Sequence, residues 1–150
     1  NFRKDRAKHW QFLLSRYNDE YVSLEKKIAM LKVERKKVAE EKATLCRLRI
    51  EYLENLRVVK GEIADKGKWL STRSFLNHLD KTLGHVEIEL RRRDSLINPL
   101  IVQQREVLKK LNKFKSLLKI EVEAEGLRKK MLEEKEGEAL NILRFNNSSS

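Results

Sequence analysis

The stretch from Trp10 to Ile63 decides the fold, and it reads WQFLLSRYNDEYVSLEKKIAMLKVERKKVAEEKATLCRLRIEYLENLRVVKGEI. A stripe of side chains recurs in it at alternating steps of four and three residues, and thirteen of its sixteen members are apolar. The members are Trp10, Leu14, Tyr17, Tyr21, Leu24, Ile28, Leu31, Arg35, Val38, Lys42, Leu45, Arg49, Tyr52, Leu56, Val59 and Ile63. A 3.5-residue repeat of this length faces one partner only when helices supercoil around each other. The stripe therefore predicts a long helix in a coiled coil.

Three cationic side chains interrupt this stripe at a spacing of seven residues, so they occupy one heptad position. They are Arg35, Lys42 and Arg49. In one interpretation their aliphatic stems pack along the seam and their charged ends reach outward. In the other, this section is loosened so that a partner can enter, and Cys46 and Leu48 take over part of the seam.

A second stripe follows a break that contains Gly61 and Gly67, and eleven of its thirteen members are apolar. Its members are Leu76, Leu79, Leu83, Val86, Leu90, Arg93, Ile97, Leu100, Gln104, Val107, Leu111, Phe114 and Leu118. Pro99 lies within it and should kink the helix or remove one hydrogen bond. Ser71 or Thr72 is a suitable N-cap for this second helix.

The composition supports few and very long helices. Five Gly and one Pro among 150 residues cannot supply the turns that a sheet or a compact bundle needs. A single cysteine, Cys46, excludes an internal disulfide, and no run of 18 apolar residues could span a bilayer. The first residues lack the apolar core of a signal peptide. We expect a soluble, cytoplasmic protein.

Two stripes joined by one break predict an all-α fold, a long antiparallel two-helix coiled-coil hairpin formed by residues 1–150 as one domain. We expect the first helix over about 3–60, the turn over about 61–72, the second helix over about 73–142 and a disordered tail over 143–150. A turn centred near 66 would place residue i beside roughly residue 133 minus i. The basic residues Arg3, Lys4, Arg6 and Lys8 then face the acidic end of the second helix. That end carries Glu121, Glu123, Glu125, Glu133, Glu134, Glu136 and Glu138.

Candidate catalytic and metal sites do not meet the spacing that their chemistry needs. Between Gly61 and Gly67 lie five residues, where a phosphate-binding loop needs four, and Trp69 stands where its Ser or Thr should follow Lys68. His78 and His85 are two helical turns apart, too far to share one metal ion. We therefore expect no enzyme, no cofactor and no metal site.

The net charge of +11 raises the question of nucleic acid binding. Nine basic residues against two acidic ones fall between 91 and 119, and such a face can contact phosphates. They are Arg91, Arg92, Arg93, Arg105, Lys109, Lys110, Lys113, Lys115 and Lys119. No exposed aromatic side chain is interleaved with them, because Phe114 belongs to the seam. A solvated face or a docking surface for an acidic protein fits better than nucleic acid.

The segment from Leu45 to Leu83 resembles a known family. It carries Leu45, Tyr52 and Leu56, then thirteen residues up to Trp69 and after it Phe75, Leu79 and Leu83. This arrangement is similar to the flagellar export protein FliJ and its YscO-type counterparts in type III secretion. Length, hairpin plan and the position of the break agree over nearly the whole chain. The family's pattern differs from this sequence at Glu41, Leu48, Thr82 and Val86.

The resemblance implies a non-enzymatic central stalk on the cytoplasmic side of a bacterial secretion apparatus in the inner membrane. Family members insert the free ends of the hairpin into a hexameric export ATPase, which here implicates Arg3, Lys4, Arg6 and Lys8. The middle of the hairpin contacts the cytoplasmic ring of the export gate, and the matching positions are Leu45, Tyr52, Phe75 and Leu79. Export chaperones are a further class of partner. The alternatives are a generic coiled-coil scaffold or chaperone adaptor and a basic nucleic-acid-binding coiled coil.

Overall fold

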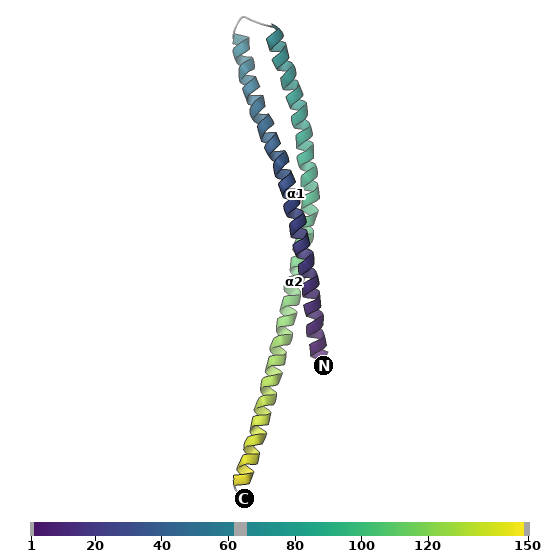
Figure 1. Cartoon of the computed structure of the whole chain (residues 1–150), viewed down its shortest axis with the longest axis vertical. Helices are drawn as coiled ribbons and strands as arrows, with labels where there is room; N and C mark the ends of the chain where they lie inside the picture. Colours follow the sequence, from purple (N-terminus) through teal and green to yellow (C-terminus); the bar gives the residue numbers. More distant parts are fainter. Residues whose placement is uncertain (1, 62–65, 149–150) are drawn as a thin grey trace. The chain divides into compact units, whose positions relative to one another are not determined.

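A computed structural model describes residues 2–61 and 66–148, and all of them are helical. Helix α1 spans Phe2–Gly61 and helix α2 spans Lys66–Ser148 (Figure 1). The two helices pack against each other, which confirms the all-α two-helix hairpin. No described helix is apolar over enough of its length to cross a membrane.

The hairpin divides into two compact units, and each draws on both helices. Unit 1 comprises Asn1–Val22 and Arg105–Ser150, and unit 2 comprises Ser23–Gln104. In unit 2 the two helices lie side by side and antiparallel, on either side of the break (Figure 1). The two helices that pack against each other thus belong to one chain.

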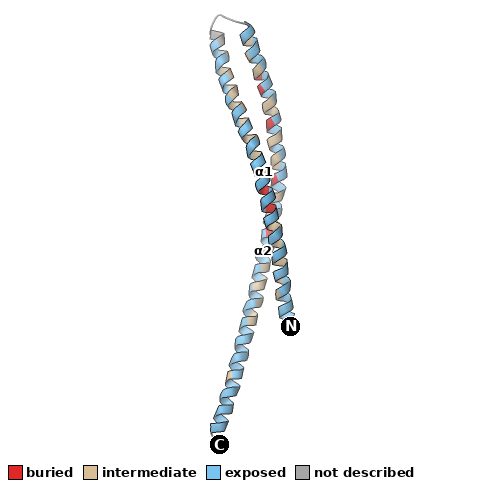
Figure 2. Cartoon of the chain, in the orientation of Figure 1, coloured by how far each residue is buried: buried red, intermediate tan, exposed pale blue. Residues whose placement is uncertain are grey.

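Both predicted stripes form the seam. Every stripe member whose side chain the structure describes is buried or half-buried (Figure 2), while Val59 and Ile63 lie outside the described side chains. The buried apolar residues of unit 2 are Leu24, Ile28, Leu76, Leu79, Val86 and Ile97, and those of unit 1 are Val107 and Leu111. Burying one such side chain contributes about 1.5–3 kcal/mol. The seam is therefore the main source of stability in each unit.

Aromatic rings fill the seam of unit 1. Phe114 on α2 stacks on both Trp10 and Tyr17 of α1, with ring centroids 5.5 and 5.6 Å apart. Offset stacking of this kind adds roughly 0.5–1.5 kcal/mol beyond the buried area. One phenylalanine thereby contacts two residues of the facing helix that are two turns apart.

The predicted boundaries of the second helix are wrong at both ends. Helix α2 begins at Lys66 instead of about 73, and the Thr72 hydroxyl donates to the Lys68 carbonyl four residues earlier, so Thr72 lies inside the helix and caps nothing. At the other end the helix includes 143–148, which we expected to be disordered. One glycine in a helix costs only about 1 kcal/mol, so the first turn of α2 accommodates Gly67. Of the predicted turn and tail, residues 62–65 and 149–150 lie outside the described part of the chain.

The predicted register is wrong by about one helical turn. The rule placed Arg35 beside Asn98, whereas its guanidinium binds the carboxylate of Asp94. The cause is the early start of α2, which moves the centre of the turn toward the N-terminus. Pro99 lies within α2, which continues through it without interruption.

Intramolecular pairing in unit 2 can be measured with two spin labels. Lys36 and Asn98 are exposed and line the same groove, so labels at these positions, in a Cys46→Ser background, should lie within roughly 20 Å, since packed helix axes are about 8–10 Å apart. Dilution with unlabelled protein should leave the distance unchanged. A distance that disappears on dilution would mean that the pairing is between chains.

Candidate interaction surfaces

The three cations that interrupt the first stripe form a ladder of ion pairs across unit 2. Each is half-buried and reaches a carboxylate on α2, and those carboxylates are also seven residues apart. The pairs are Arg49 with Asp80 at 2.6 Å, Lys42 with Glu87 at 3.7 Å and Arg35 with Asp94 at 2.5 Å. We call these six residues the ion-pair ladder. The ladder supports the interpretation in which the aliphatic stems of these three cations pack along the seam. It also shows that their charged ends pair with carboxylates of α2.

The ladder selects an orientation more than it adds stability. Its side chains keep between 39% and 50% of their surface exposed, and ion pairs with that exposure are typically worth 1 kcal/mol or less. The hydrogen bond from Arg35 to Asp94, followed by their Coulomb attraction, raises the pKa of Arg35. A parallel arrangement, or a shift by one turn, would separate all three pairs at once.

A reversed ion pair lies beside the ladder. Arg93, the cation that interrupts the second stripe, binds Glu34 on α1 and Glu89 one turn earlier on its own helix. Both stripes therefore carry cations that meet carboxylates from the facing helix. The sequence contains a signal for the ladder, because Asp80, Glu87 and Asp94 repeat every seven residues in the same way as their partners. The spacing of the cations alone does not identify these carboxylates.

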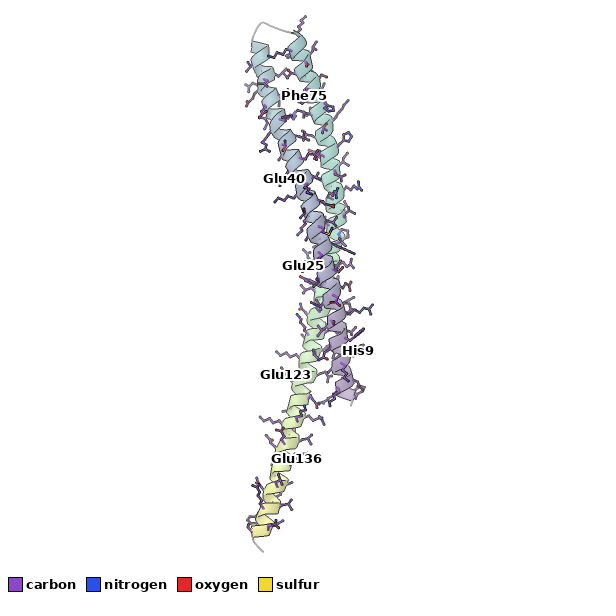
Figure 3. All side chains as sticks on the ribbon, viewed as in Figure 1. His9, Glu25, Glu40, Phe75, Glu123 and Glu136 are labelled. Atoms are coloured by element: carbon purple, nitrogen blue, oxygen red, sulfur yellow. The ribbon has the colours of Figure 1, made fainter. Side chains whose placement is uncertain are left out.

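The four residues matched to gate binding all lie in unit 2, and the structure brings the two aromatic ones among them into contact. Tyr52 on α1 and Phe75 on α2 have ring centroids 4.4 Å apart, and both are half-buried. Phe75 lies in the part of α2 that is near the break (Figure 3). Leu45 is half-buried, whereas Leu79 is only 3% exposed. The aromatic pair therefore keeps surface that a partner could reach, while Leu79 serves the core.

The residues matched to ATPase binding lie in unit 1, near the N-terminal end of α1. Arg6 binds Glu121 at 3.3 Å, which agrees with the expected meeting of the basic start and the acidic end. Arg3 and Lys4, with Ala7, line a groove of about 300 Å³ whose other wall is formed by α2. Its α2 lining is Glu121, Val122, Glu125, Gly126 and Lys129. The lining of this groove combines small and apolar residues with three basic and two acidic side chains.

Glu125 in this wall is held ionised by its own helix. The hydrogen bond that Arg128 donates to it lowers the pKa of Glu125, against a smaller opposing effect of desolvation. A lowered pKa means that the pair stabilises the folded helix at neutral pH. That contribution is lost as the pH falls through the pKa of the folded state.

The basic segment between 91 and 119 is partly neutralised within each unit. In unit 2, Arg92 and Arg93 bind Glu89. In unit 1, Lys109 binds Glu106 and Lys119 binds Glu123. These pairs reduce the charge that would be available to phosphates.

The remaining candidate sites are dispersed over the helices. Gly67 and Lys68 lie inside α2, and His78 and His85 are exposed on the same helix. Cys46 is a half-buried free thiol. Within residues 2–61 and 66–148, no three His, Cys, Asp or Glu side chains are grouped so that they could hold a metal ion.

Comparison with known proteins adds no relative: no family description, no curated protein and no solved structure matches this chain.

The ladder can be tested by charge exchange. Asp94→Arg places two cations together and should lower the free energy of unfolding by about 1 kcal/mol, whereas Asp94→Ala should cost less because it only removes an exposed pair. The double variant Arg35→Asp/Asp94→Arg should recover most of the loss. Urea unfolding followed by circular dichroism measures all three. If the double variant is no more stable than Asp94→Arg alone, these two residues do not face each other.

Proposed function

We propose that this chain is a non-enzymatic central stalk of a bacterial type III secretion or flagellar export apparatus. In this role it works in the cytoplasm beside the inner membrane, inserts into the hexameric export ATPase and couples it to the export gate. The observation that carries the proposal is the contact between Tyr52 and Phe75 across the hairpin. Both aromatic members of the set that resembles the gate-binding surface meet there, one from each of the two facing helices.

The ion-pair ladder suits unit 2 to coupling. Axial sliding of one helix along the other would break three ion pairs and displace the apolar side chains from their facing positions. A force applied to one helix of this unit is therefore shared by the other. A stalk requires this property, and it does not require a catalytic group.

Charge suits unit 1 to an acidic ring. Lys4 and Lys8 are exposed, and neither forms an ion pair within the described part of the chain. Because these two lysines have no such ion pair to break, they can contact carboxylates of a partner directly. This supports the assignment of Arg3, Lys4, Arg6 and Lys8 to the ATPase, with Arg6 already held by Glu121.

Binding to the ATPase is the direct test of the proposal. The purified chain should retain the export ATPase encoded by the same organism, and Lys4→Glu/Lys8→Glu should weaken that binding about tenfold or more through like-charge repulsion. The matched control is Lys26→Glu/Lys27→Glu, which changes two exposed lysines in unit 2 and should bind as the parent does. Absence of any ATPase binding would favour the scaffold or adaptor alternative instead.

The chain should raise the ATP turnover of that ATPase and hydrolyse nothing alone. The expectation rests on the resemblance and on the unsuitable spacing around Lys68. Phosphate release measured with the chain alone, with the ATPase alone and with both distinguishes these contributions. Turnover by the isolated chain that Lys68→Ala abolishes would contradict the non-enzymatic role.

Phe75→Ala should weaken binding to the cytoplasmic ring of the export gate about tenfold or more, since losing an aromatic anchor typically costs about 2 kcal/mol. It should leave ATPase binding unchanged, because that contact is assigned to unit 1. Phe12→Ala, at an exposed phenylalanine of unit 1, is the control for gate binding. Calorimetry or surface plasmon resonance gives the affinities, and circular dichroism checks that the variant remains helical.

Leu79 is unsuitable for the same experiment. Truncating a side chain that is 3% exposed should cost about 2 kcal/mol or more of folding free energy. Any loss of binding would then report unfolding. If Phe75→Ala stays folded and binds the gate as tightly as the parent, the assignment of this surface is wrong.

A further inference from the structure

The C-terminal part of α2 carries an apolar face that lies outside the seam. Toward α1, helix α2 presents Glu121 and Glu125, whose side chains are only 13% and 20% exposed. Ile120 and Leu127 nevertheless keep 61% and 62% of their surface in solvent. Successive residues of an α-helix point about 100° apart, so α1 covers a neighbouring face and leaves this one open. An occupant of this face must therefore be something other than α1.

This face continues along the helix at steps of three or four residues. Its members are Ile120, Ala124, Leu127, Met131, Glu134, Glu138, Ile142 and Phe145, which we call the outer face. The large apolar members after Leu127 are also exposed, at 54% for Met131, 61% for Ile142 and 72% for Phe145. Apolar residues at this spacing are typical of a helix that packs against another helix. Two glutamates divide the outer face into an apolar part on either side.

The charged residues around the outer face can pair with the charged residues of a second copy of the chain. Arg128, Lys129 and Lys130 form a basic block, and Glu133, Glu134, Glu136 and Glu138 follow as an acidic block interrupted by Lys135. Residues 120–148 hold five basic and seven acidic side chains, although the whole chain has a net charge of +11. Two copies of the chain therefore repel each other least at this segment. An antiparallel pair with its axis near Glu134 brings Lys130, the last residue of the basic block, beside Glu138, the last residue of the acidic block, of the other copy.

We propose that two copies of the chain associate antiparallel through the outer face, with the twofold axis near Glu134. In this register Leu127 lies level with the partner's Ile142, so the two apolar parts of the face meet. Lys130 lies level with the partner's Glu138, and Lys135 with the partner's Glu133 and Glu134. Twofold symmetry makes each of these contacts twice. A parallel pair would instead set Glu138 against its own copy and separate Lys130 from Glu138 by about two helical turns.

Sedimentation velocity on the purified chain over stepped concentrations tests the association. We expect a monomer–dimer equilibrium, and Leu127→Asp should raise its dissociation constant about tenfold or more, since it places two charges in the apolar contact. Leu140→Asp is the matched control, because Leu140 is 56% exposed but lies on the opposite side of the helix from the outer face. It should dimerise as the parent does. Both positions are exposed in the single chain, so both variants should keep the parent's helix content.

Charge reversal tests the antiparallel register. Lys130→Glu should raise the dissociation constant about fivefold, because an exposed pair is lost twice. The double variant Lys130→Glu/Glu138→Lys should return it to within about twofold of the parent. A chain that stays monomeric at about 100 µM would overturn the proposal. So would equal effects of Leu127→Asp and Leu140→Asp, or a double variant that recovers nothing. No other protein is added, so the result does not depend on the proposed stalk function.

Discussion

The apolar seam between α1 and α2 is the interaction on which the rest of the structure depends. A helix of sixty residues and one of eighty-three residues have no other core available, and their large apolar side chains are buried only where they face each other. The 3.5-residue spacing keeps these side chains on one side of each helix for the full length of a unit. Every surface considered for a partner is therefore defined by its position relative to the seam.

Charged residues decide how the two helices face each other. Leucines and valines at heptad positions would pack almost as well after a shift by one turn, because their contacts are similar in every layer. The ion-pair ladder and the reversed pair of Arg93 with Glu34 distinguish the observed alignment from such shifts. Their partial exposure explains why they select a register at little gain in stability. An apolar seam with similar contacts in every layer, flanked by ion pairs that fit only one alignment, suits a hairpin whose helices must not slide along each other.

Periodicity predicted the seam well, because the 3.5-residue spacing of residues such as Leu24, Leu79 and Leu111 places them on the side of each helix that faces the other, where they are buried. It predicted boundaries poorly, since α2 already includes Gly67 and Thr72 in its first turns and continues through the polar residues after Leu143. The register depends on where α2 begins, so an error at the turn moved every expected pair. The candidate surface at Tyr52 and Phe75 was predicted from a resemblance, and the hairpin plan already placed the two residues near one level, where the structure shows their rings in contact. The periodicity of the seam did not predict the outer face, because that face lies about 100° around the helix from the continuation of the seam stripe.

Residue-resolved hydrogen exchange tests the seam most directly. The amides of the two helices in unit 2 should exchange slowly and together, because opening either helix exposes the same apolar contact. At concentrations too low for association between chains, residues 127–148 should exchange much faster, because their apolar side chains are exposed. Equal protection of both regions, or protection confined to one helix of unit 2, would contradict a structure that depends on the seam.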